Sequence, residues 1–237
     1  PQIAKTVIKK AYKPRKKFKY VWVFVLVVLL FPVLNGLIAA GITYASYLQF
    51  KAGRDSTALG FLNLAKNISV PSYSESNFLK HTPFFGQIYK ETEYVSYSII
   101  NVSDIAESAI PLSKTGRELI GLALGDNPYS INSTLNGSGE KMQKIYDNLS
   151  DFEKGSIEKE TEGSLLANIL LSKINLGSYK QFVSQAIVII GKLPETLGES
   201  GSKTYLILFE NNTELRPTGG FIGSYGLLTF DGGRLSD

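Results

Sequence analysis

The chain has 237 residues and a formal net charge of +4, and it contains no cysteine. This length favours one or two domains, and the missing cysteines exclude disulfide scaffolds, thiol catalysis, zinc–thiolate sites and iron–sulfur clusters. Residues 1–20 hold eight of the 25 basic residues and no acidic one, so the rest of the chain has 17 bases against 21 acids. The basic character belongs to this tail and does not indicate a nucleic-acid-binding domain.

An apolar segment follows the tail directly. Residues 21–44 contain only Asn35 and Thr43 as polar side chains. A helix of that length rises roughly 36 Å, enough to cross a hydrocarbon core of about 30 Å. We therefore expect a transmembrane helix over residues 21–48, with Tyr20 and Trp22 at one interface and Tyr44 and Tyr47 at the other. The residues expected to contact the membrane or shape the span are Val21, Trp22, Phe31, Pro32, Gly36 and Tyr44.

The charge distribution predicts the orientation of this helix. Cytoplasmic flanks are rich in Lys and Arg, so residues 1–20 are expected in the cytoplasm and the C-terminal bulk outside it. A cleaved signal peptide is the alternative, but this apolar run is longer than a signal core and Ala45-Ser46 is a poor cleavage site. The tail also suits anionic lipids, and a dedicated cytoplasmic partner is a further alternative. Because the chain begins with Pro1, we expect the native start to lie elsewhere.

Small residues gather on the second half of the apolar segment. Gly36, Ala39, Ala40 and Gly41 offer a face on which another helix could approach closely. This face predicts helix–helix contact along the membrane segment as one possible mode of interaction.

Residues 49–200 show mainly helical periodicity. The segment after Gly53 either continues the membrane helix or begins a new one. Pro111 is expected to interrupt a helix, residues 132–139 to form a polar loop, Gly177 to end one helix and Pro194 to follow another. Short loops between long amphipathic helices favour an extracytoplasmic antiparallel bundle or extended helical hairpins. The single histidine, His81, lies at an expected helix boundary and is more simply a surface residue than part of a catalytic triad.

The last segment, residues 201–237, changes to β-structure. Residues 204–209 are rich in β-branched and aromatic residues, residues 211–214 are polar and expected to break the strand, and residues 215–220 form a turn. A second strand is expected over residues 221–230, with Gly223 and Gly226 as bulges or close contacts. Asp231-Gly-Gly is a hairpin turn, and Arg234 opens a third strand. The fold class is thus mainly α, with one transmembrane helix, a helical bundle and the first strands of an α+β domain that we expect to continue further.

The polar turn of this segment is the best candidate for specific chemistry. Arg216 could clamp a pyrophosphate, with the glycine amides forming an anion nest, and the polar residues before it could orient sugar hydroxyls or a metal. Alternatively, Arg216 and Glu214 pair with each other or with turn carbonyls and lock the loop. The candidate ligand-binding residues are Asn211, Asn212, Glu214, Arg216, Gly219 and Gly220. We assign no catalytic residue, metal site or cofactor.

The motif Asn-Asn-x-Glu-Leu-Arg-Pro-Thr-Gly-Gly-Phe-Ile-Gly-Ser-Tyr, residues 211–225, resembles the opening of the bacterial "domain of unknown function 4012" proteins. The preceding layout of basic tail, membrane helix and helical region ending in Leu-Pro is similar too. The resemblance implies a bacterial envelope protein. More distantly, the arrangement is similar to that of the LytR–CpsA–Psr transferases, which move glycopolymers from polyprenyl-phosphate carriers, and this is a fold-level analogy.

Two functions follow from these observations. The first is a single-pass envelope protein acting as a structural or assembly component, with the bilayer and other membrane or envelope proteins as partners. The alternative is a glycopolymer transferase or binder that uses a polyprenyl-linked substrate. The residues do not decide whether the protein is an enzyme, and no nucleic-acid partner is expected.

The alternative predicts a specific effect of Arg216→Ala in the full-length protein. Loss of the guanidinium should abolish binding of a polyprenyl-pyrophosphate, because a bidentate phosphate contact would disappear, while the fold is kept. Lipid binding and circular dichroism measure the two properties. Unchanged binding, or loss of the fold together with binding, would argue against the phosphate site.

Overall fold

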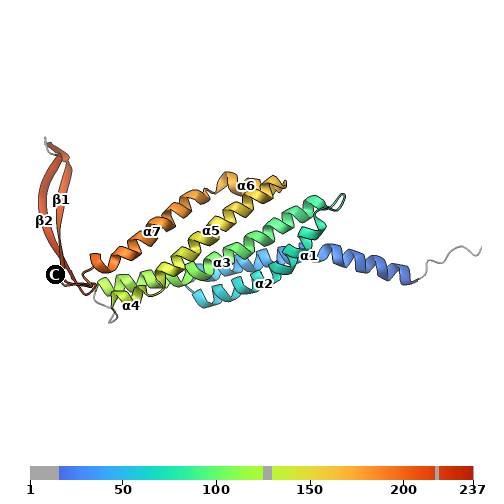
Figure 1. Cartoon of the computed structure of the whole chain (residues 1–237), viewed down its shortest axis with the longest axis horizontal. Coiled ribbons are helices and arrows are strands. Elements are labelled where there is room, and N and C mark those ends of the chain that lie inside the picture. The colour runs from blue at the N-terminus through green and yellow to red at the C-terminus, as the bar shows by residue number, and fades with distance from the viewer. Residues whose placement is uncertain (1–15, 125–129, 217–218, 237) are drawn as a thin grey trace, which may run out of the picture.

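The computed structural model describes residues 16–124, 130–216 and 219–236, and it is an elongated antiparallel helical bundle that carries a β-hairpin at one end (Figure 1). Each of four helices contacts the next in the order α1, α2, α3 and α5, and α7 packs on α5. The expected fold class, mainly α with a small antiparallel sheet, is confirmed. The helices are α1 (Lys16–Lys51), α2 (Asp55–Leu79), α3 (Gly86–Ala123), α4 (Ile131–Leu135), α5 (Ser138–Thr161), α6 (Leu165–Lys173) and α7 (Leu176–Thr196).

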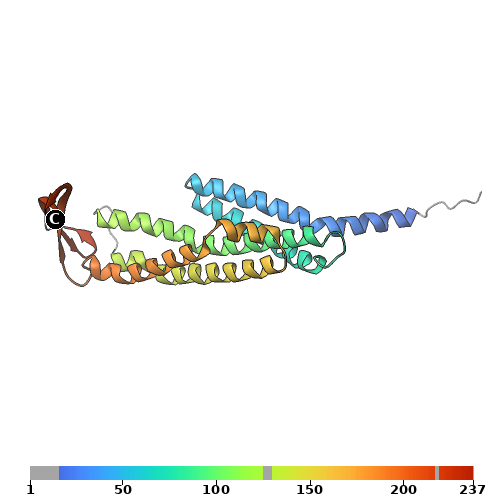
Figure 2. The ribbon, with the colours of Figure 1, turned by 90° about the horizontal axis from the view of Figure 1, so that it is seen from above.

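Helix α1 has two differently covered parts. Its first part extends beyond the other helices in both views (Figure 1, Figure 2), and its side chains from Val23 to Val28 are exposed. Among the described residues, Val23–Lys51 is the segment long and apolar enough to cross a membrane, with a hydropathy of 2.7. This agrees with the expected membrane helix at the level of length and composition.

The second part of α1 packs on α2 and α3 through small side chains. Ala39 is fully buried in a cluster with Ala65 and Ile99. A Cβ atom on Gly36 would lie 3.2 Å from Cγ2 of Thr92, so glycine allows α3 to approach closely. The small-residue face that could have served another chain is thus occupied, at Gly36 and Ala39, by helices of the same chain.

Serine and tyrosine hydroxyls form hydrogen bonds to backbone carbonyls of the neighbouring helix at this contact. Ser72 Oγ donates to the carbonyl of Pro32 at 2.7 Å, and Tyr89 Oη donates to that of Leu29 at 2.9 Å. At the other end, Ser46 Oγ donates to the carbonyl of Ala58 at 2.7 Å. These bonds hold α2 antiparallel to α1, so the segment after Gly53 begins a new helix that folds back.

Two expectations about proline were wrong. Helix α3 continues through Pro111, and α7 continues through Pro194 to Thr196. A proline removes one backbone hydrogen bond from a helix, but packing can compensate for that loss. At Pro111 the neighbouring Ile110 is buried against Ala58 and Leu62 of α2, and this packing stabilises the continued helix.

The expected loop over residues 132–139 was also wrong, because α4 and the start of α5 lie there. Ser130 Oγ accepts the N–H of Ser133 and caps α4, whose Ile131 and Leu135 are buried. Gly177 does not end a helix either. It lies in the first turn of α7, which Asn175 caps by accepting the N–H of Ser178 at 3.0 Å. In both cases a helix begins where a loop or a helix end was expected, and a polar residue just before it caps its N-terminus.

The sheet contains β1 (Lys203–Arg216), β2 (Gly219–Asp231) and β3 (Arg234–Leu235), in that order and antiparallel. Strand β1 extends past the expected break at residues 211–214 as far as Arg216. Phe209 pairs with Ser224 and Glu210 with Ile222, so Gly223 is the extra residue of a β-bulge, as expected. Gly232 and Gly233 have φ of 56° and 86°, which fits the expected two-residue turn between β2 and β3.

Candidate functional site

The candidate ligand-binding residues lie at the tip of the β1–β2 hairpin. Backbone pairing joins Asn211 to Phe221 and Arg216 to Gly219, so the two halves of the motif face each other across the hairpin. The side chains of residues 211–216 and 219–221 lie outside the described residues, as do Pro217 and Thr218 entirely. The structure therefore brings the backbone of the six candidate residues together, and their ligand-binding role stays a prediction.

The base of the hairpin is fastened to the end of the bundle by glycine contacts. The N–H of Gly233 donates to the carbonyl of Leu197 at 2.8 Å, and the N–H of Gly232 donates to that of Gly198 at 3.0 Å. A Cβ on Gly198 would lie 2.5 Å from the carbonyl oxygen of Phe230, and a Cβ on Gly233 3.0 Å from Cβ of Ile131. Only glycine allows this approach, and both residues also have positive φ.

The hairpin presents an apolar face that no described residue covers. Leu206 pairs with Leu227 and Leu208 with Tyr225, so these four side chains share one face of the two strands. We call it the open face. Leu206 and Leu227 are 59% and 62% exposed, and Tyr225 is 71% exposed. Apolar residues gathered in one exposed patch are typical of an interaction surface.

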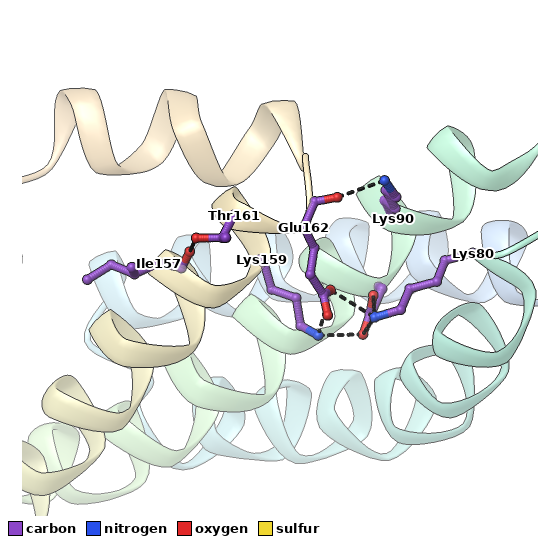
Figure 3. A network of polar contacts seen from close by, with 7 residues as sticks. Lys80, Lys90, Ile157, Lys159, Thr161 and Glu162 are labelled. Atoms are coloured by element: carbon purple, nitrogen blue, oxygen red, sulfur yellow. Dashed lines mark hydrogen bonds and ion pairs between the residues drawn. The ribbon is translucent and has the colours of Figure 1, made fainter.

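A second polar feature lies at the opposite end of the bundle, where α2, α3 and α5 meet (Figure 3). Glu93 of α3 is fully buried between two lysines, with Nζ of Lys159 at 2.7 Å and Nζ of Lys80 at 3.2 Å. Glu162 lies over both lysines, 2.8 Å from Lys80 and 3.3 Å from Lys159. Two positive and two negative groups thus form a neutral cluster, which we call the charge network; Lys80, Glu93 and Lys159 are buried, and Glu162 lies at the exposed edge.

The charge network connects α2, α3 and α5, and its Lys159 is not suited to catalysis. Burial by itself lowers the pKa of Lys159, but the hydrogen bond and negative charge of Glu93 outweigh that effect and raise it above the ordinary value. For Glu162, burial would raise the pKa, yet the contacts with Lys80 and Lys159 lower it. A lysine that stays protonated has no lone pair for nucleophilic or base catalysis. Lys159 is therefore unsuited to that chemistry near neutral pH.

Glu91 forms a neighbouring contact that fixes α6. Its carboxylate accepts the N–H groups of Leu165 and Leu166 at 2.8 and 3.0 Å and the hydroxyl of Ser164 at 2.9 Å. The first N–H groups of a helix have no partner within the helix, and the helix N-terminus favours a negative charge nearby. Burial opposes ionisation of Glu91, but the hydrogen bonds prevail and lower its pKa below the ordinary value of a glutamate.

Sequence reasoning missed the charge network. One signal was available: Phe152, Ser156 and Lys159 occupy successive positions on the buried face of α5. A lysine on such a face indicates a buried ion pair. Its partners could not be found from periodicity, because Lys80 and Glu93 lie 79 and 66 positions away in the sequence.

The predicted membrane residues take different positions on α1. Phe31 and Tyr44 are exposed, whereas Pro32 and Gly36 are buried against the other helices. Val21 and Trp22 lie in the described helix, but their side chains are outside the described part. In the described portion of the chain no group of three or more His, Cys, Asp or Glu side chains is placed to hold a metal ion.

Comparison with known families gives a match for the terminal segment. Residues 200–236 match the family model described as "Protein of unknown function (DUF4012)". The resemblance drawn from the motif is thereby confirmed for this segment, while the analogy to the LytR–CpsA–Psr transferases receives no support. No curated protein and no solved structure matches the chain.

The charge network predicts a large effect of Glu93→Gln. The two lysines would keep their charges without the carboxylate between them, and removing one partner of a buried pair costs about 3–5 kcal/mol. Chemical denaturation in mild detergent measures the free energy of unfolding. Glu153→Gln, which breaks the more exposed pair with Lys180, is the control and should cost at most about 1 kcal/mol. Equal losses in the two variants would contradict the assignment.

The contacts of Glu91 predict a dependence on acidic pH. Because its pKa is lower in the folded protein than in the unfolded chain, Glu91 stabilises the fold above pH 4.5 and loses this effect as the pH falls through the folded-state pKa. Thermal unfolding of wild type and Glu91→Gln between pH 7 and pH 3 measures it. The variant should be less stable at pH 7 and should lose less stability on acidification. Parallel curves would show that the charge of Glu91 does not matter.

Proposed function

We propose that the protein is a membrane-anchored assembly component of the cell envelope. Helix α1 holds it in the cytoplasmic membrane with its N-terminus in the cytoplasm. The bundle serves as an extracytoplasmic stalk, and the hairpin is the element that binds a partner protein. This is a binding function, and it requires no catalytic residue.

The open face of the hairpin carries the proposal. Its leucines and Tyr225 are exposed although the hairpin is rigidly fastened through Gly198 and Gly233. An anchored base and an uncovered apolar face are what a docking surface needs, since binding then costs little ordering entropy. Exposed strands also offer backbone groups to which a partner can add a further strand.

The dimensions of the stalk support the same function. Helix α3 has 38 residues, which corresponds to a rise of about 57 Å. The hairpin lies at one end of the molecule and the free part of α1 at the other (Figure 1). A helical bundle of this length would present the hairpin well away from the bilayer surface, within reach of other envelope proteins.

The glycopolymer transferase or binder remains the alternative. Its proposed residues, Arg216 above all, have side chains outside the described part, so no contact favours it over the binding function. The test with Arg216→Ala separates the two.

The docking function predicts that charges on the open face dissociate the complex. The double variant Leu206→Lys and Leu227→Lys introduces two adjacent positive charges where an apolar partner would bind, which opposes association. Membranes of cells that make the full-length protein are solubilised in mild detergent, and the size of its complex is measured by native electrophoresis. The variant should stay in the membrane fraction but run as a smaller species than wild type.

Ile157→Lys provides the matched control for this experiment, since Ile157 is an exposed apolar residue of α5, away from the hairpin. This variant should keep the wild-type complex. A double variant that is folded by circular dichroism and keeps a complex of unchanged size would refute the docking role of the open face.

A further inference from the structure

The turn between α2 and α3 exposes a cluster of large apolar side chains. Phe78 is 81% exposed and Phe84 100% exposed, and Phe85 and Ile88 are each at least half exposed. We call these four residues the phenylalanine turn. Large aromatic side chains gathered at one exposed tip are costly in water and mark a surface that is covered by something else.

The backbone holds this tip rigidly outward. Phe84 has φ of 68°, and among the described residues it is the one non-glycine with positive φ. A bulky residue in that conformation is a true outlier, of the kind that clusters at functional positions. The N–H of Gly86 donates to the carbonyl of Thr82 at 3.1 Å, and a Cβ on Gly86 would lie 2.5 Å from the carbonyl oxygen of Lys80. The turn is therefore closely bonded and directs Phe84 into the surroundings.

The phenylalanine turn lies beside helix α1. It lies at the end of the bundle where α1 leaves the other helices (Figure 2). Phe85, Ile88 and Tyr89 line a cavity of about 260 Å³ together with residues of α1, and Tyr89 also bonds to the carbonyl of Leu29. The lining residues of α1 are Leu26, Leu29, Leu30 and Val33. The turn thus continues the exposed apolar surface of the candidate membrane helix.

Charged groups begin directly behind the tip. From Gly86 to Glu93 the helix α3 rises about 10 Å, and over that distance the surroundings change from phenylalanines to Lys90, Glu91 and the charge network. Three uncharged or titratable polar residues, Asn77, His81 and Gln87, are also exposed around the turn. An apolar tip backed by charged residues matches the polarity gradient from acyl chains to headgroups, where aromatic side chains are enriched.

We propose that the phenylalanine turn inserts into the outer leaflet of the bilayer that α1 crosses. This inference rests on the proposed membrane anchoring and adds a second membrane contact, which fixes the outer face of the bilayer near Val33. The segment from Lys17 to Val33 then rises about 24 Å. It is shorter than a hydrocarbon core of about 30 Å, and local thinning of the bilayer absorbs the difference. The charged groups of the bundle stay outside the hydrocarbon.

Tryptophan fluorescence in vesicles tests the insertion. Trp22 is the single tryptophan of the chain, so the wild type reports on the anchor, and Phe84→Trp combined with Trp22→Phe reports on the turn. Both full-length proteins are reconstituted in phosphatidylcholine–phosphatidylglycerol vesicles, with and without bromine atoms on the acyl chains. We expect brominated lipid to remove most of the emission of Trp22 and of Trp introduced at position 84, and this emission to be shifted to the blue.

Two further single-tryptophan proteins, Tyr44→Trp and Tyr225→Trp, serve as controls in the Trp22→Phe background. Both tyrosines are exposed, and they lie beyond the proposed outer face and on the hairpin. Their emission should respond to acrylamide in water and not to brominated lipid. Quenching of Tyr44→Trp by lipid as strong as that of Phe84→Trp would overturn the bilayer position near Val33.

The remaining outcomes separate the anchor from the turn. Lipid quenching of Trp22 without quenching of Phe84→Trp would overturn the insertion and leave the anchor intact, whether acrylamide reaches the turn or a protein surface covers it. No lipid quenching at either position would overturn the anchor itself, and the insertion with it.

Discussion

The contact of α1 with α2 and α3 determines how the rest of the molecule is arranged. Helix α1 has 36 residues, and its second part is covered on one side by α2 and α3. Gly36 and Ala39 let the neighbouring helices approach, while the hydroxyls of Ser72 and Tyr89 bond to carbonyls of α1. These bonds join α1 to α2 and α3. They also place the α2–α3 turn beside the part of α1 that leaves the bundle.

The charge network strengthens the same end of the bundle. Glu93 is shared by Lys80 and Lys159, so the contact joins three different parts of the chain, and Glu162 balances the remaining positive charge. A buried ion pair is weak support for stability, because desolvation offsets the attraction between the charges. Its stronger effect is on specificity, because any sliding of α5 along α3 would separate Lys159 from the buried carboxylate of Glu93. The network therefore helps to set the register of α5 against α3.

The two ends of the molecule do different things in the proposed function. At one end, α1 and the phenylalanine turn meet lipid, and two contacts would restrict the tilt of the stalk where one helix alone would not. At the other end, Gly198 and Gly233 fasten the hairpin to the bundle so closely that its orientation follows that of the stalk. The open face and the motif at the hairpin tip would then be held at a defined height and direction, which suits an assembly component.

Local features of this protein were readable from the sequence alone. The apolar segment, the Asp231-Gly-Gly turn and the bulge at Gly223 depend on composition or on residues a few positions apart, and all three are present in the structure. Tertiary packing decided the rest. Pro111 stays inside a helix because Ile110 is buried against α2. Helix α4 forms where a loop was expected because Ile131 and Leu135 are buried, and Lys159 is internal because it pairs with Glu93. These outcomes depend on partners far away in the chain, whose burial and charge outweigh the local preference of a proline, a polar loop or a lysine.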